Sequence, residues 1–167
     1  MPVLIDGNNL LHAAQEDTPE RPPGRSTLCD LLGLWAERTG ESVRVIFDGP
    51  APTAARAQQI GHAAIEVAFS GAGVKADDVL IGLLDADSAP RRLRVVSSDR
   101  EIIRAARRRQ ARPARSGEFW MELRRALERP PPAPRTLPKA KHQGLAPGET
   151  DDWLRAFGML PPEDTGV

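Results

Sequence analysis

Three aspartates in the sequence, Asp6, Asp48 and Asp99, follow short runs of mainly aliphatic residues, the last of them after two serines. The apolar runs cover residues 3–5, 43–47 and 93–96. Runs of this length and type predict buried strands, and the helical patterns between them predict that the strands are parallel. Because the carboxyl ends of parallel strands open on one edge of a sheet, where ligands bind, we expect the three carboxylates to converge there.

Two further carboxylates, Asp77 and Asp78, stand at the start of a predicted helix. Hard divalent cations such as Mg²⁺ and Mn²⁺ prefer oxygen ligands and often bind a few carboxylates while keeping several waters. Several aspartates in one crevice would repel one another strongly without a cation, so their convergence favours a metal site. A metal there could lower the pKa of a bound water and neutralise a phosphate, which is what phosphodiester hydrolysis requires.

Each aspartate also has a structural explanation that involves no metal. Asp6 and Asp48 precede glycine, and Asp-Gly is common in turns. Asp77 and Asp99 stand where a helix N-cap is expected, and capping explains either of them. This explanation does not account for the expected position of the acids. Three of them follow strands that end on the same edge of the sheet, and the start of a helix adds a fourth acid.

Polar residues beside the acids are further candidates. A sharp turn is expected at Gly7, and Asn8 or Asn9 is expected to cap the helix that follows the first strand. Ser97 and Ser98 end the last predicted strand of the sheet. Their hydroxyl groups could satisfy backbone groups there, or they could orient the next aspartate or a water.

Arginines dominate the stretch that follows the last of these acids, almost without interruption by carboxylates. They are Arg100, Arg104, Arg107, Arg108, Arg109, Arg112 and Arg115. With a helix over residues 100–109, Arg100, Arg104 and Arg108 lie four residues apart and line an outer stripe. The stripe, with Arg107 beside it, would flank the acidic crevice and attract the phosphate backbone of RNA. A basic face that is merely solvated is the alternative.

The net charge does not indicate a class of binding partner, because 23 Lys and Arg residues balance 23 Asp and Glu residues. The length of 167 residues suits one domain with a real core. The one cysteine, Cys29, fits a reducing compartment and a buried structural thiol. No signal peptide and no apolar stretch long enough to span a membrane is present, so we expect a cytoplasmic protein with no membrane partner. Aromatic residues make up 4%, which disfavours a surface for stacking bases.

Other catalytic and binding motifs are missing from the sequence. Gly71-Ala72-Gly73 lacks the rest of a dinucleotide-binding fingerprint, and there is no phosphate-binding P-loop. His12, His62 and His142 are scattered and accompanied by one cysteine, so a zinc site is not expected. Neither a nucleophile elbow nor a Cys/His pair is evident.

Strands and helices alternate along the chain, which predicts an α/β fold with a mainly parallel sheet. A further strand is expected over residues 65–69, and helices over 10–15, from Ser26 or Thr27 to Gly40, from 77, over 100–109 and over 119–127. The sequence predicts a domain over residues 1–127, a proline-rich linker over 128–147 and a short helix with a tail over 148–167. The helix, over 150–157, is expected to dock on its own domain.

In several short pieces of sequence the chain resembles a known family, the YacP-like branch of the NYN domains within the PIN-like nuclease superfamily. The matching pieces are Ile5-Asp6-Gly7-Asn8-Asn9-Leu10, Val45-Ile46-Phe47-Asp48-Gly49, Val67-Ala68-Phe69-Ser70, Ala76-Asp77-Asp78, Val95-Val96-Ser97-Ser98-Asp99 and Ser116-Gly117-Glu118-Phe119. Their order and spacing together carry the resemblance, which covers about residues 1–127. It implies a PIN-like three-layer sandwich of helices around the sheet, dependence on Mg²⁺ or Mn²⁺, and cleavage of RNA.

The resemblance also implies roles for individual residues. By position, the metal ligands of the family correspond to the acids that end the first and fourth strands and open the helix between them: Asp6, Asp99 and Asp77. Asp78 is the alternate acid at the helix start, Asp48 is a supporting acid, and Asn9 matches an asparagine that orients its neighbours by hydrogen bonds. The chain departs from the family at Asn8, where tyrosine or another larger residue is usual.

The leading hypothesis from the sequence is a metal-dependent endoribonuclease, acting on single-stranded RNA in mRNA decay or RNA processing. Its catalytic residues would be Asp6, Asp77, Asp99, Asn9, Ser97 and Ser98. Its metal ligands would come from Asp6, Asp48, Asp77, Asp78 and Asp99. One alternative is a non-catalytic module that binds RNA or the ribosome, and another is a phosphatase or DNA nuclease on a similar sheet.

Overall fold

The computed structural model describes residues 1–53, 60 and 62–129. The chain divides into two compact units, Met1–Pro130 and Pro131–Val167. The predicted linker from residue 130 onward and the predicted helix over 150–157 lie outside the described residues. All of the described residues belong to the first unit.

A five-stranded sheet forms the middle of this unit, with the strand order β3-β2-β1-β4-β5. The strands are β1 (Val3–Asp6), β2 (Val43–Phe47), β3 (Ile65–Phe69), β4 (Arg94–Val96) and β5 (Arg112–Ala114). The helices are α1 (Gly7–Asp17), α2 (Arg25–Thr39), α4 (Ala76–Ala86), α5 (Arg100–Arg108) and α6 (Ser116–Glu128), with a short 3-10 helix at Pro90–Arg92. All four strand pairings are parallel.

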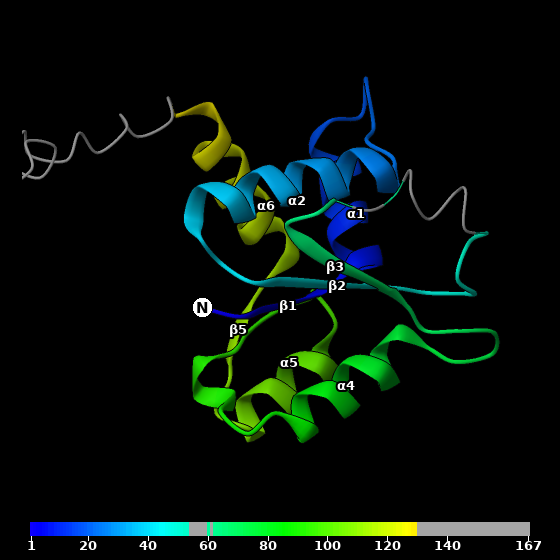
Figure 1. Ribbon diagram of the computed structural model, residues 1–167, viewed down its shortest axis with the longest axis vertical. Helices are drawn as coiled ribbons and strands as arrows, with labels where there is room; N and C mark the ends of the chain where they lie inside the picture. Colours follow the sequence, from blue (N-terminus) through cyan, green and yellow to red (C-terminus); the bar gives the residue numbers. More distant parts are fainter. Residues whose placement is uncertain (54–59, 61, 130–167) are drawn as a thin grey trace, which may run out of the picture. The chain divides into compact units, whose positions relative to one another are not determined.

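Helices cover both faces of the sheet, with α1, α2 and α6 on one face and α4 and α5 on the other (Figure 1). The central strand β1 is buried along its whole length, as is typical of a parallel strand covered on both sides. Val3 and Ile5 belong to the core under α1, α2 and α6, whereas Leu4 belongs to the core under α4 and α5. The predicted three-layer α/β sandwich with a parallel sheet is confirmed.

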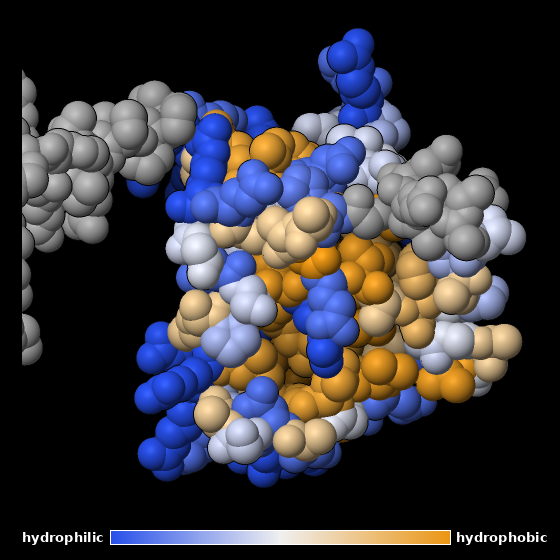
Figure 2. Space-filling view, in the orientation of Figure 1, coloured by the Kyte–Doolittle hydropathy of each residue, from blue (hydrophilic) through white to orange (hydrophobic). Residues whose placement is uncertain are grey.

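The edge strand β3 is less covered than the centre of the sheet. Ile65, Val67 and Phe69 are partly buried and pack against the core under α1 and α2. On the face shown in Figure 2, apolar side chains gather over β3 in the region between α2 and α4. The apolar core thus extends to this side of the molecule.

The start of α2 differs from the prediction. The helix begins at Arg25 after Gly24 and has no side-chain cap, so the predicted cap by Ser26 or Thr27 is wrong. Its end is as predicted, because Gly40 adopts a left-handed conformation with φ of 69° and closes the helix. Cys29 on this helix is fully buried, and burial raises the pKa of its thiol to about 12, which confirms a structural thiol.

Strand β5 was not predicted from the sequence, and α6 begins earlier than expected, at Ser116 instead of residue 119. The strand consists of Arg112, Pro113 and Ala114, which carry no alternating apolar pattern. Proline is tolerated here because β5 is an edge strand of the sheet. No helix in the described parts of the chain is both long and apolar enough to cross a membrane.

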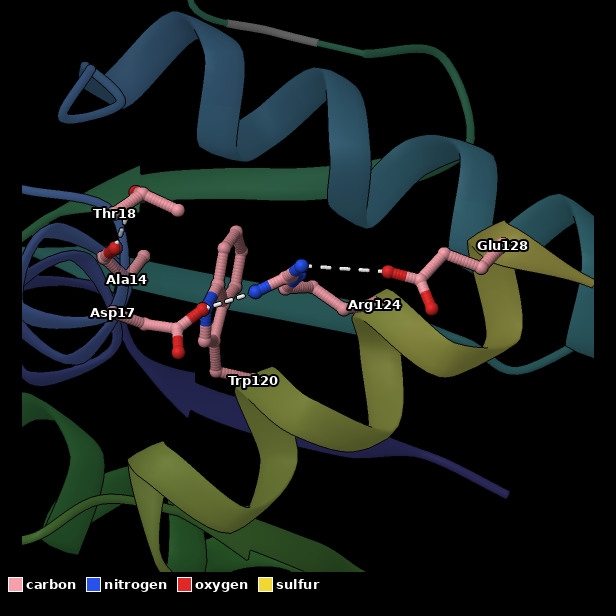
Figure 3. A network of polar contacts seen from close by, with 6 residues as sticks. All are labelled: Ala14, Asp17, Thr18, Trp120, Arg124 and Glu128. Carbon is pink, nitrogen blue, oxygen red and sulfur yellow. Dashed lines mark hydrogen bonds and ion pairs between the residues drawn. The ribbon is translucent and has the colours of Figure 1, made fainter. Parts of the chain in front are cut away.

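A polar network joins the end of α1 to α6 (Figure 3). The Asp17 carboxylate accepts hydrogen bonds from the indole Nε1 of Trp120, at 3.0 Å, and from the guanidinium of Arg124. Arg124 also reaches Glu128, with 3.4 Å between Nη2 and Oε1. These bonds hold the pKa of Asp17 below its usual value, chiefly through Trp120 and then Arg124.

We expect Asp17→Asn to lower Tm near neutral pH, because the folded state favours the ionised carboxylate. A lowered pKa contributes stability above the pKa of the unfolded chain, and this contribution is lost as pH falls through the folded-state pKa. The difference in Tm between wild type and variant should therefore shrink between about pH 7 and about pH 3. Thermal melts by circular dichroism would measure it, with Glu20→Gln on the neighbouring loop as control. A difference that stays constant with pH would contradict this assignment.

Candidate active site

The ends of β1, β2 and β4 bring the predicted acids to one edge of the sheet. In the registers of the paired strands, Asp6 lies beside Ile46 of β2, and Ile5 lies beside Val96 of β4. Asp48 and Asp99 follow these neighbouring strands within a few residues. The first strand thus places Asp6 between the other two acids.

Asp6 is almost completely buried, with 2% of its surface exposed, and both oxygens of its carboxylate accept hydrogen bonds. Its Oδ1 accepts from the backbone N–H of Asn9 at 3.0 Å, so Asp6 itself caps α1. Its Oδ2 accepts from the Asn9 side-chain amide and, at 3.0 Å, from the Ser97 hydroxyl. The predicted cap by Asn8 or Asn9 is wrong, because the helix begins at Gly7 and the aspartate before it accepts the capping bond.

Ser97 connects Asp6 to the loop that carries Asp99. Its side chain is fully buried, and its Oγ donates to Asp6 and accepts from the backbone N–H of Asp99 at 3.0 Å. Asp99 caps α5, since its Oδ1 accepts from the N–H groups of Glu101 and Ile102 at 2.6 and 3.4 Å. The exposed Ser98 makes no side-chain hydrogen bond within the described part of the chain.

Asp48 holds the start of α4. Its Oδ1 accepts from the backbone N–H of Ala76 at 2.7 Å, and its Oδ2 accepts from the side-chain amide of Asn8. Asn8 in turn accepts from the Arg25 guanidinium at 3.4 Å. The structural explanation of Asp77 as an N-cap is therefore wrong, because Asp77 lies inside the first turn of α4 and Asp48 bonds the first helical N–H.

Asp77 carries the clearest sign that the acids share one site. Burial raises the pKa of its carboxyl above the usual value, and repulsion by Asp6, Asp99 and Asp48 raises it further. Its side chain is partly buried and has no hydrogen-bond partner among the residues described. Asp78 is exposed and is not among the carboxylates that act on Asp77.

Whether these residues suit a metal depends on their chemistry and their spacing. No three histidine, cysteine, aspartate or glutamate side chains in residues 1–53, 60 and 62–129 lie close enough together to hold a metal ion. Asp6 and Asp48 instead direct both oxygens at N–H and O–H donors. The donor set nevertheless consists of hard oxygens, and the repulsion on Asp77 is what a cation would relieve. The acids therefore offer the type of ligand that Mg²⁺ and Mn²⁺ prefer, without the spacing of a formed metal site among the described residues.

The predicted arginine stripe divides into residues with different surroundings. Arg100, Arg104 and Arg107 line a groove beside α5, whereas Arg108 is not part of its lining. Arg109 has a structural role, because its guanidinium donates to the carbonyls of Asp85 and Asp87 at the end of α4, at 3.1 and 2.9 Å. Arg115 was not among the predicted RNA-binding residues, yet it lies across the same groove after the unpredicted strand β5.

The sequence matches the family model of the YacP-like NYN domain over residues 3–142. The chain belongs to the YacP-like NYN domain family. This membership indicates a nuclease-like function related to RNA. A comparison with curated protein sequences found no significant match.

The fold is similar to crystal structures of Rae1 (YacP) from Bacillus subtilis. A mutant form of Rae1 aligns with a TM-score of 0.60 and 18% identity, over 98% of this chain and 87% of the Rae1 chain. A second Rae1 structure aligns with a TM-score of 0.58 and 19% identity, over 95% of this chain and 92% of the other. At these identities the likeness establishes the shared fold.

Proposed function

We propose that this protein is a metal-dependent endoribonuclease that hydrolyses phosphodiester bonds in RNA. The observation that carries the proposal is the gathering of Asp6, Asp48, Asp77 and Asp99 at one edge of the sheet, where burial and the three other acids raise the pKa of Asp77. Acids that gather at the carboxyl edge of a parallel sheet, with a perturbed pKa among them, are typical of functional sites. Membership of the YacP-like NYN family supports the choice of RNA as substrate.

In this proposal Asp6, Asp77 and Asp99 would hold Mg²⁺ or Mn²⁺, whereas Asp78, the alternate acid at the helix start, is exposed and takes no part. Bound there, the metal would supply Lewis acidity and charge neutralisation toward a phosphodiester. The chain's own residues orient the acids. Asn9 and Ser97 fix both oxygens of Asp6.

The proposal gives Asp48 a positioning role in addition to its predicted role as a supporting acid. Both of its oxygens are engaged, one by the first N–H of α4 and the other by Asn8. The bond to α4 fixes the turn that carries Asp77. Asp48 and Asn8 thus act on the site through the position of another carboxylate.

The test is cleavage of end-labelled single-stranded RNA by the purified protein with Mg²⁺, with Mn²⁺ and with EDTA. We expect cutting that needs the metal and is lost in Asp99→Asn. This variant is a clean one, because asparagine caps a helix about as well as aspartate. Asp6→Asn should be inactive too, but its amide would face the N–H and O–H groups that now bond the carboxylate. Metal-stimulated cutting that persists in both variants would contradict the proposal.

Other results of the same assay would indicate a different function. RNA binding without cleavage under any metal condition would favour the non-catalytic module that binds RNA or the ribosome. Cleavage of DNA or of small phosphate esters in preference to RNA would indicate a DNA nuclease or a phosphatase. A programmed translating ribosome should be included as substrate, because a ribosome-dependent enzyme would leave bare RNA intact.

A further inference from the structure

A groove of about 440 Å³ runs between α5 and the junction of β5 with α6. Arg100, Arg104 and Arg107 line it from the side of α5. Arg115 and Glu118 line it from the other side, at the start of α6. The lining of the groove thus contains four arginines and one carboxylate.

The groove lies next to the site formed by the strand-end aspartates. Arg100 directly follows Asp99, and Arg115 directly follows β5. Since β5 is parallel to β4 and adjacent to it, Arg115 lies at the same edge of the sheet as the strand-end aspartates. A strand bound across the acids would therefore meet the groove on the β5 side.

The four arginines of the groove are free to bind an anion. None of their guanidinium groups makes an ion pair or a hydrogen bond with the described residues. Three arginines elsewhere are paired with acids: Arg44 with Glu66, Arg94 with Glu122 and Arg124 with Asp17. The groove thus gathers unpaired guanidinium groups, whose forked donors suit phosphate oxygens.

The other residues of the lining indicate which part of a nucleic acid the groove would contact. The remaining residues are Ile103, Pro113 and Ala114, so no aromatic side chain is available for stacking on bases. Contacts to phosphate position a strand and carry no sequence information. The N-terminus of α6 also lies at the groove and has no side-chain cap. Its backbone N–H groups add partial positive charge there, which favours an anion.

We propose that this groove binds the sugar-phosphate backbone of the RNA strand next to the bond that is cut, without regard to base sequence. Arg115 holds the backbone from one side, and Arg100, Arg104 and Arg107 hold it from the other. The inference rests on the proposed function and deepens it. It adds Arg115 to the predicted RNA-binding residues and removes Arg108, which lies outside the groove.

Binding of fluorescein-labelled oligouridylate, followed by fluorescence anisotropy in EDTA, tests the proposal without any cleavage. We expect Arg115→Gln and Arg104→Gln each to weaken binding about 5- to 10-fold, and to lower the slope of log K against log salt by about 0.7. Glu118→Gln should strengthen binding, because it removes the one negative charge of the lining. Arg108→Gln and Arg125→Gln are matched controls that should bind like wild type.

The outcomes separate this inference from the proposed function. Because binding is measured without metal, a protein that never cleaves can still lose affinity in Arg115→Gln, and the groove assignment would then stand. Wild-type affinity of Arg115→Gln, or an equal loss in Arg108→Gln, would overturn it. The same losses with oligocytidylate would support recognition of the backbone, whereas a loss confined to oligouridylate would overturn that part.

Discussion

Asp77→Asn is expected to give a protein that is more stable than wild type and inactive. Partial burial and repulsion from Asp6, Asp99 and Asp48 raise the pKa of Asp77, so its ionised form opposes folding at neutral pH. Because solvent screens much of the repulsion, removing the charge should increase the free energy of unfolding by only about 0.5 kcal/mol, on the order of 2 °C in Tm. Since losing a group that merely orients a metal ligand costs about 10- to 100-fold, losing the ligand itself should cost at least about 100-fold in cleavage rate.

The pH dependence of this gain has a definite sign. A carboxyl whose pKa is raised in the folded state destabilises the protein above that pKa, and protonation removes the penalty. The stability gain of Asp77→Asn should therefore be present at neutral pH and disappear as pH falls into and below the usual range of aspartate. Thermal melts in EDTA across this range would measure it.

Comparison with the adjacent carboxylate makes the experiment specific. Asp78→Asn should change neither Tm nor the cleavage rate much, because Asp78 is exposed and does not contribute to the repulsion on Asp77. Added Mg²⁺ or Mn²⁺ should raise the Tm of wild type more than that of Asp77→Asn, since a cation that binds the folded state stabilises it. Equal metal-induced shifts in wild type and Asp77→Asn would remove Asp77 from the metal site.

Gly7→Ala is expected to destabilise the fold by about 3 kcal/mol, on the order of 10 °C in Tm. A Cβ atom at Gly7 would lie 2.5 Å from Cδ1 of Phe47 and 2.8 Å from the carbonyl oxygen of Ile46. The Phe47 ring is fully buried and the carbonyl belongs to a paired strand, so neither neighbour can move freely. The variant should also lose activity, because Gly7 directly follows Asp6.

The same substitution at Gly82 is the control for this experiment. Gly82 lies inside α4, and a Cβ atom there would meet nothing within 4 Å. Because glycine within a helix costs about 0.5–1 kcal/mol relative to alanine, Gly82→Ala should raise the stability. Opposite signs at the two glycines are the expected result in a urea or thermal denaturation series. A Gly7→Ala protein as stable as wild type would show that the contact between the start of α1 and β2 can adjust.

Much of the fold could be predicted because its central strands are buried on both faces. Strands β1 and β2 appear in the sequence as short apolar runs, and each run leads to an aspartate. Helix α5 was predicted by the arginines and apolar residues that alternate at helical spacing. For these elements the local pattern and the tertiary environment agree.

Local patterns failed where a residue's role depends on a distant partner. Strand β5 carries no apolar alternation and exists through its pairing with β4. The first N–H of α4, at Ala76, bonds to Asp48, which lies 28 residues earlier in the chain, so no capping motif in the sequence could reveal this bond. The reason for Gly7 is likewise a contact with β2 instead of the sharp turn that was expected.

The sequence by itself determined the α/β class, the parallel central strands and the acids that end them, because strand burial and chain direction follow from local patterns of residue type. Only the tertiary structure decided which acid caps which helix, and that Asp77 is the one under repulsion from the others. It also decided that Arg115 faces the arginines of α5. Such partnerships join residues far apart along the chain, and hydrogen bonds and charge repulsion act through distance in space, which the order of residues does not encode locally.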